Sequence, residues 1–304
     1  MKAAKKPWVF NKVGPIPNAL ISALFIALAL GTLLPLVFVV VISFSSEASI
    51  VAKGYSFIPM EWSTAAYDYL LDTSNYIGRA FVNSIGITIT GTLLGLMLIS
   101  TLGYTISRPS FRLRGVYTAF IFIPMMFSGG LVSTYMVNTQ VFGLKNTYLA
   151  LILPGACSTW YAIIMRTFFQ TTIPDSIIES GKIDGASQLR IFVRLVLPIS
   201  LPVIATIGLF LTFAYWNAWY GAMLYLDSSH RDLYPLQYVL VSIQNSISFM
   251  ARNEEYFTSE ITKTIPTESS RMAIVTVVVL PIACSYPFFQ RYFINGLTIG
   301  AVKG

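Results

Sequence analysis

Six long apolar stretches constrain the fold of this chain more than any other feature of its sequence. They run, with approximate ends, over residues 18–44, 80–106, 116–136, 148–168, 195–226 and 272–293. A helix needs about 20 mainly apolar residues to cross the hydrocarbon core of a bilayer. Only 11% of the residues are charged, whereas soluble domains carry about 25%. The sequence therefore predicts an all-α integral membrane protein with six transmembrane helices.

The distribution of charge over the loops predicts the orientation of these helices. With both termini and the loops at 107–115 and 166–194 on one side, that side carries 13 of the 20 lysines and arginines but 3 of the 13 acidic residues. Cytoplasmic loops are enriched in lysine and arginine. We therefore expect cytoplasmic tails at residues 1–16 and 297–304 and a transmembrane domain at 17–296. The first stretch is too long for the apolar part of a cleaved signal peptide and is expected to remain as a span.

The sequence disfavours several other classes of protein. The net charge is +7, but no basic run is interleaved with aromatic residues, so we expect no nucleic-acid partner. Ion-coupled carriers often place ionisable groups at membrane depth, and these stretches contain almost none. Catalytic motifs and the Walker A pattern are absent. His230 has no second ligand nearby, and Cys157 and Cys284 lie in apolar stretches, so we expect neither a metal site nor a disulfide framework.

Small residues recur along the second apolar stretch. Gly91 and Gly95 form a GxxxG pattern, and Gly86 and Gly103 lie nearby. Small residues allow two helix backbones to approach closely. The pattern predicts tight helix packing inside one subunit, with a contact between two subunits as the alternative.

The cytoplasmic loop at residues 172–194 differs from the other loops. Pro174 and Asp175 favour the first turn of a helix. Asp184 and Gly185 favour a break, because glycine tolerates a positive φ and aspartate can cap the next helix. Helical spacing of apolar residues then continues at Leu189, Phe192, Val193 and Val196. We predict two short helices on either side of a sharp turn, with apolar residues that either pack under the bundle or form a docking surface for a soluble partner.

The same loop contains a recognisable motif. Residues 179–186 read Glu-Ser-Gly-Lys-Ile-Asp-Gly-Ala, and Phe192, Leu195 and Leu197-Pro198 follow. This run resembles the EAA motif of binding-protein-dependent ABC importer permeases, which is E-A-A-x-x-D-G-A followed at the same spacing by F, I and L-P. The second and third positions hold serine and glycine where the family usually has alanines. The resemblance extends from about residue 77 to the end of the chain.

The resemblance implies a type I ABC importer permease fold and a role for this loop. It would be the coupling helix that enters a cleft on an ATPase subunit. Glu179 would pair with a basic residue of that subunit, Gly185 would permit the turn, and Phe192 would pack in the helical pair. Asp184 and Ala186 complete the set of residues expected to couple the chain to the ATPase.

Further similarities narrow the expected function. Residues 290–304 resemble the ending of maltose-type carbohydrate permeases, in which a glycine-bearing tail reaches toward the ATPases; a frayed end is the alternative. Residues 143–148, 163–169 and 233–237 resemble a subgroup associated with complex oligosaccharides or polysaccharides. The resemblance thus implies a non-catalytic permease subunit of an ATP-driven carbohydrate importer in the bacterial plasma membrane.

That function implies a set of partners. They are a second homologous permease subunit, two ATP-binding cassette ATPase subunits and an extracytoplasmic sugar-binding protein. ATP and Mg would be held by the ATPases, and this chain would bind no cofactor. It would contact membrane lipid and the carbohydrate substrate.

Aromatic rings next to amides suggest where a sugar could be contacted. Aromatic faces stack on the C–H surfaces of sugars, and amides and hydroxyls bond the sugar hydroxyls. The candidate pathway residues are Trp216, Asn217, Trp219 and Tyr220 in the fifth stretch and Asn83 in the second. Two alternatives stay open: tryptophan and tyrosine gather at membrane interfaces, and Asn217 can bond a neighbouring helix.

The outer connection at residues 227–271 is long and acidic. Its segment 233–250 is fairly apolar but contains Gln237, Gln244 and Asn245, so we interpret it as a surface helix rather than a seventh span. The connection is either a solvated cap or a landing surface for the sugar-binding protein. Two rival functions remain: an ABC permease for a peptide, amino acid or polyamine, and a membrane-embedded enzyme such as an acyltransferase.

Overall fold

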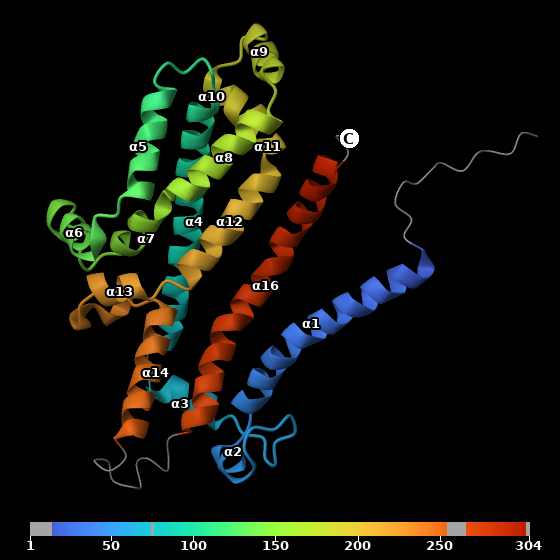
Figure 1. Cartoon of the computed structure of the whole chain (residues 1–304). Coiled ribbons are helices and arrows are strands. Elements are labelled where there is room, and N and C mark those ends of the chain that lie inside the picture. Colours follow the sequence, from blue (N-terminus) through green and yellow to red (C-terminus); the bar gives the residue numbers. More distant parts are fainter. Residues whose placement is uncertain (1–13, 74–75, 254–265, 302–304) are drawn as a thin grey trace, which may run out of the picture. The chain divides into compact units, whose positions relative to one another are not determined.

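The computed structural model describes residues 14–73, 76–253 and 266–301, which form helices joined by loops (Figure 1). The chain divides into two compact units. The first contains α1 (Pro15–Ser43), α2 (Glu47–Lys53), the start of α3 (Ala65–Thr73) and residues 267–276 of α16 (Thr267–Ala301). The second contains the helices from α4 (Ile77–Ser107) onward and the rest of α16.

The six predicted stretches all correspond to apolar helical segments of the described chain. Three helical segments are long and apolar enough to cross a membrane by themselves: α1, α4 and residues 267–285 of α16. Two further candidates are bent pairs, namely α7 (Leu149–Ala156) with α8 (Thr159–Thr172), and residues 188–199 with α12 (Leu201–Trp216). The third stretch contains the shorter apolar helix α5 (Arg114–Met126).

Three of the stretches are not the continuous helices that the hydropathy predicts, and the fourth of the six is the pair α7 and α8, bent by 45°. In the third, α5 ends at Met126, and α6 (Gly130–Met136) and η1 (Val137–Val141) follow a break. Pro124 removes a backbone donor near this end, and Gly130 has a φ of +80°, which favours glycine. The fifth bends by 81° near Ser200, where Pro198 and Pro202 flank the bend. It also stops at Trp216, before the separate helix α13 (Tyr220–Tyr225).

Helix α4 forms the centre of the second unit, where α8 and α12 pack against it (Figure 1). A β-carbon added at Gly91 would lie 2.5 Å from the Tyr215 ring, and one at Gly95 would lie 3.0 Å from Leu211. Both partners belong to α12. Gly103 lies equally close to α8. Gly91, Gly95 and Gly103 therefore pack against helices of their own chain, as tight packing inside one subunit predicts, whereas Gly86 is exposed and an added β-carbon there would meet no atom within 4 Å.

The outer connection begins with η3 (Ser228–Leu233) and α14 (Leu236–Arg252). Helix α14 follows directly on Pro235 and forms where the sequence predicts a helix; its position at the membrane surface stays a prediction. One face of α14 is buried, through Leu236, Val239, Leu240, Ile243 and Ile247. Before it, a hydrogen bond from Asn146 and the ammonium group of Lys145 lower the pKa of the Asp227 carboxyl.

In the first unit, the side chain of Glu47 caps the N-terminus of α16. Its carboxylate accepts the backbone N–H groups of Glu268 and Ser269 at 3.0 and 3.1 Å, and the Ser269 hydroxyl at 2.9 Å. The first N–H groups of a helix lack partners within the helix and favour a negative charge. Tyr55 and Arg271 both bond the carboxylate of Glu268. This polar cluster fixes α2 to the beginning of α16.

Helix α1 has a long apolar surface that its own chain does not cover. Within α1, only Ile42 and Ser43 are buried, and its hydropathy is the highest of the candidate spans. Apolar side chains around a whole helix are stable in lipid or against another membrane helix. Helix α1 is therefore suited to a membrane environment.

Candidate functional site

The predicted two-helix loop is present, and we call residues 174–199 the elbow. It consists of α9 (Asp175–Ile183), a turn at residues 184–187, α10 (Gln188–Ile191), η2 (Phe192–Val196) and α11 (Leu197–Ile199). Gly185 has a φ of +73°, as expected for a glycine that permits the turn. Backbone hydrogen bonds from Gly185 to Lys182 and from Ala186 to Gly181, at 3.0 and 2.9 Å, close the turn.

Asp184 does not cap the second helix, so that prediction is wrong. Its backbone N–H bonds the end of α9, and the side chain of Ser187 accepts the Arg190 N–H at 3.3 Å. The turn uses Gly185 and Ala186 as well, which moves the start of α10 beyond the reach of Asp184. Ser187 is therefore the residue in the capping position.

α-Helical spacing predicts that the four apolar residues after the turn share one buried face, but they do not. Phe192 and Val196 are buried, but Leu189 is 71% exposed and Val193 is also exposed. The chain makes a wide π-helical turn at residues 192–196. This turn adds a residue per helical turn and rotates the faces, so that Ile191 takes the place of Val193 in the core.

Gly181 brings the two arms of the elbow together. A β-carbon at this position would lie 3.1 Å from Ile191 and 3.2 Å from Leu195. These contacts are tighter than side chains normally make, although the EAA pattern usually has alanine here. The glycine lets α9 pack more closely on the second arm than an alanine would.

The tip of the elbow is exposed and mixed in character. Ile183 is 85% exposed, and Leu189 lies exposed on the other side of the turn. Glu179 and Asp184 are exposed as well, and no ion pair joins Glu179 to any residue in the described ranges. Ala186 is half-buried against the core, and Phe192 is buried. Lys182 and Arg190 are also exposed, so the described elbow presents a tip with apolar residues and charges of both signs on a buried base.

Two of the candidate pathway residues have structural partners in this chain. The amide of Asn83 donates to the backbone oxygens of Asp232 and Tyr234 at 2.7 and 3.0 Å, and accepts the Tyr148 hydroxyl at 2.8 Å. Asn217 donates to a backbone oxygen of α12 and accepts the Gln237 amide at 3.1 Å. Both amides therefore hold the outer connection to the bundle.

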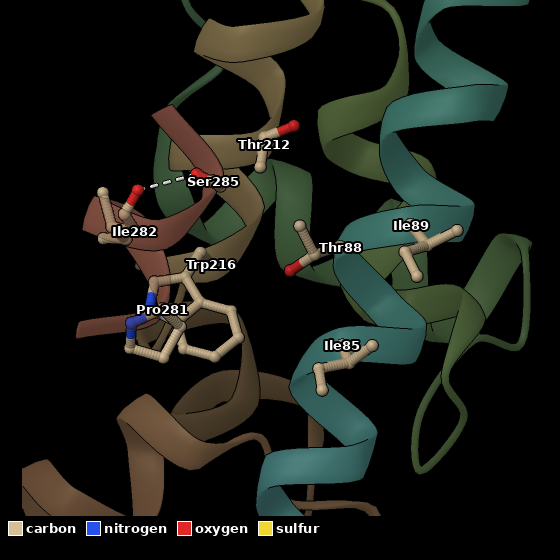
Figure 2. Close-up of a pocket in the computed structure, with 8 residues that line it drawn as sticks. All are labelled: Ile85, Thr88, Ile89, Thr212, Trp216, Pro281, Ile282 and Ser285. Carbon is tan, nitrogen blue, oxygen red and sulfur yellow. Dashed lines mark hydrogen bonds between the residues drawn. The ribbon is translucent and has the colours of Figure 1, made fainter. Parts of the chain in front are cut away.

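Trp216 lines a cavity of about 190 Å³ between α4, α12 and the second-unit part of α16 (Figure 2). Its ring is buried, and Nε1 donates to the backbone oxygen of Val278 at 3.1 Å. Figure 2 shows Thr88 directed from α4 toward the cavity, and its buried hydroxyl has no hydrogen-bond partner among the described residues. The other lining residues are mainly apolar: Ile85, Ile89, Thr212, Pro281, Ile282 and Ser285. The cavity offers a solute one unused hydroxyl and an apolar wall.

Trp219 lines a different space, an open groove of about 520 Å³ between α13 and α14. We call it the outer groove, and its lining consists of Trp219, Met223, Tyr238, Val241, Ser242, Asn245, Ser246, Phe249 and Met250. The hydrogen bond between Gln237 and Asn217 ties the loop that carries Trp219 to the start of α14. Tyr220 packs edge-on against Trp219, with ring centroids 5.7 Å apart. The structure therefore separates the two tryptophans of the predicted cluster.

Residues 91–299 match the family described as binding-protein-dependent transport system inner membrane component. The match covers more than half of the chain and includes the whole elbow. The chain belongs to this family of permeases. It is a multi-pass membrane protein with the type I ABC importer permease fold. As a transport component it is not an enzyme, and the alternative of a membrane-embedded acyltransferase is excluded.

Known relatives match the permease over nearly its whole length. YtcP of Bacillus subtilis, a polygalacturonan/rhamnogalacturonan transport system permease protein, is 36% identical over 94% of this chain and 98% of its own. LplC of Bacillus subtilis is 35% identical over 90% of each chain. A chain in the crystal structure of a bacterial ABC transporter that imports the acidic polysaccharide alginate is 28% identical, with a TM-score of 0.76. That match covers 94% of the permease and 99% of the solved chain.

Sequence reasoning did not identify two features of this permease. Arg108 counts only as one of the cytoplasmic cations in the sequence, but the structure buries it beside the elbow. The polar face of α14 is the second feature: Asn245 was interpreted only as an interruption of an apolar segment, and Ser242 and Ser246 were not considered. Their spacing of three and four residues is the signal that could have placed them on one helical face.

Proposed function

We propose that this permease imports oligosaccharides or polysaccharides as part of an ATP-driven complex. The observation that carries the proposal is the near full-length similarity to YtcP, whose name states a polygalacturonan and rhamnogalacturonan substrate. The alginate importer and AraQ, an arabinooligosaccharide permease of Halalkalibacterium halodurans that is 26% identical over 97% of this chain, support the same class of solute. All of these named substrates are chains of sugar units.

The proposed complex contains three kinds of partner protein. A second homologous permease subunit completes the pathway, and two ATP-binding cassette ATPases bind ATP and Mg. An extracytoplasmic sugar-binding protein delivers the solute to the outer connection at residues 227–271. This chain holds no cofactor itself. Family membership supports the assembly, because the family description names dependence on a binding protein and an inner-membrane location.

The elbow is the proposed contact with the ATPases. Its exposed apolar residues, Ile183 and Leu189, flank the turn and would be covered on docking. The exposed Glu179 is available for an ion pair with a basic residue of the ATPase. Phe192 and the half-buried Ala186 keep the base of the elbow in the bundle. The C-terminal tail is proposed to reach the ATPases too; residues 297–301 continue α16, and residues 302–304 lie outside the described residues.

The outer groove is the proposed sugar-contacting part of this chain. Trp219 and Tyr238 supply aromatic rings, and Ser242, Asn245 and Ser246 supply polar groups on the facing helix. The amide of Asn245 is exposed. Polar groups in contact with lipid would lack hydrogen-bond partners, so this face is better suited to water or a hydroxyl-rich solute. Tyr220 supports the Trp219 ring from the side.

A transport assay on the reconstituted complex tests the substrate class. The permease would be assembled with its partner subunits in liposomes and supplied with labelled tetragalacturonate, an alginate tetramer, an arabino-oligosaccharide, a peptide and a polyamine. We expect uptake of at least one saccharide that requires both ATP and the binding protein. Glu179→Lys should abolish this uptake while the complex still assembles. Uptake of the peptide or polyamine without any saccharide would contradict the proposal and favour the non-sugar ABC permease.

A further inference from the structure

Arg108, the residue that follows the end of α4, is a buried cation with three separate partners. The residue is 8% exposed. Its Nη2 donates to the backbone oxygen of Phe169 in α8 at 2.7 Å, and its Nη1 donates to the carboxylate of Asp175 at 3.1 Å. Nε donates to the hydroxyl of Ser107 at 2.9 Å. One side chain thus joins α4, α8 and the first residue of α9.

Tyr104, one helical turn before Arg108, extends the same contact to the other arm of the elbow. Its ring centroid lies 4.9 Å from that of Phe192 and 5.9 Å from that of Phe169. The guanidinium carbon of Arg108 lies 5.4 Å from the centroid of the Tyr104 ring. Together, Tyr104 and Arg108 contact both arms of the elbow, through Asp175 on α9 and Phe192 on η2.

This arrangement differs from that of an ordinary cytoplasmic cation. An arginine at a membrane edge normally extends its charged end into water, whereas Arg108 turns inward. A buried guanidinium is stable only while its acceptors stay in place. The planar guanidinium carries its donors on three separate nitrogens and so reaches these three acceptors at once, whereas a lysine ammonium would have to serve them from one nitrogen. The contact therefore favours one relative position of α4, α8 and α9.

We propose that Arg108 is a positioning residue that makes α4 move together with the elbow. A displacement of the elbow by an ATPase would then act on α4 directly, and not only along the chain through α8 and α12. Because α4 packs on Tyr215 and Leu211 of α12 through Gly91 and Gly95, the displacement would continue into the bundle. This inference rests on the proposed docking of the elbow to an ATPase.

The first test measures whether α4 and the elbow stay at a fixed distance. In the full complex, Cys157 and Cys284 would be replaced by serine, and spin labels would be attached at Leu93→Cys on α4 and Ser176→Cys on α9, both exposed positions. Electron spin resonance would compare the distance distribution with and without Mg and a non-hydrolysable ATP analogue. We expect one narrow distribution that is the same in both states. With Asp175→Asn, we expect it to broaden and shift when the nucleotide is added.

The second test measures coupling. Asp175→Asn should lower the amount of saccharide imported per ATP hydrolysed by about fivefold, which is the lower end of usual coupling effects. Arg108→Lys should act in the same direction, because one ammonium group cannot replace the fork. Arg112→Gln, a change at an exposed arginine of the same loop, is the matched control and should have no effect.

Several results would overturn the proposal. One is an unchanged distance distribution and unchanged coupling with Asp175→Asn, a change at an exposed side chain that leaves the core intact. Another is a wild-type distance that changes when nucleotide binds. The distance measurement needs no imported solute. A complex that keeps the fixed distance but imports no saccharide therefore counts against the proposed substrate and not against Arg108.

Discussion

Gly185 is the residue of the elbow whose conformation depends most on its lack of a side chain. Its φ of +73° lies in the left-handed region, and a β-carbon there would meet no atom within 4 Å. A substitution would therefore strain the backbone rather than collide with neighbours. The same residue is part of the D-G-A portion of the motif, so its role in the turn follows from both the pattern and the geometry.

Replacing Gly185 tests whether the turn of the elbow depends on this backbone conformation. Gly185→Val should cost about 1–2 kcal/mol in the turn, because a β-branched residue is disfavoured in the left-handed region. We expect it to displace the tip of the elbow and abolish ATP-coupled uptake, while membrane insertion and assembly are retained. Gly185→Asn is the control, because asparagine adopts this conformation more readily. Equal uptake by the valine and glycine proteins would argue against a fixed turn.

At the level of elements, α14 has two faces with different environments. Its buried face packs on the bundle, and its other face lines the outer groove opposite Trp219. Tyr238 and Phe249 lie 11 residues apart on this second face, which corresponds to about 16 Å along a helix. Ser242 and Asn245 lie between them. The groove thus has aromatic groups near its ends and polar groups in the middle.

We predict that the outer groove contributes to substrate affinity. Trp219→Ala should raise the KM for saccharide uptake by about three- to tenfold, since an aromatic contact contributes about 0.5–1.5 kcal/mol. The maximal rate should stay near that of the wild type. Trp160→Ala, which removes an exposed tryptophan of α8 away from the groove, is the control. If Trp219→Ala instead prevents assembly with the second permease, the groove is a subunit interface.

For the whole molecule, the proposed orientation rests on the charge of its loops. The elbow side carries most of the lysines and arginines, and loops rich in these residues favour the cytoplasmic side. Both termini are therefore proposed to be cytoplasmic, and residues 227–271 extracytoplasmic. The elbow needs this orientation in order to meet an ATPase.

Cysteine labelling in intact cells tests this orientation. In a chain without Cys157 and Cys284, single cysteines would be placed at the exposed positions Ile183 on the elbow and Val51 on α2. A membrane-impermeant maleimide should label Val51→Cys directly, but label Ile183→Cys only after permeabilisation. Labelling of Ile183→Cys in intact cells would place the elbow outside and rule out an intracellular ATPase as its partner.

Hydropathy, loop charge and one motif were sufficient to predict the class of protein, its six apolar segments and the two-helix form of the elbow. These properties depend on residues that are close together in the sequence, because a span is defined by about 20 neighbouring side chains. Gly91, Gly95 and Gly103 of α4 were also correctly assigned to packing inside one chain. The capping residue was not, since it depends on how many residues the turn uses, and the buried face of the second arm was not, since it depends on a π-helical turn that no periodicity marks.

Only the tertiary structure decided how distant residues meet. Arg108 and Phe169 are 61 positions apart, and nothing near Arg108 in the sequence shows that its charge is buried. Trp216 and Trp219 are three positions apart, but the end of α12 between them directs one ring into the bundle and the other into the outer groove. The burial of a charge and the direction of a side chain at a helix end depend on which elements pack there, and packing partners are chosen by the fold as a whole.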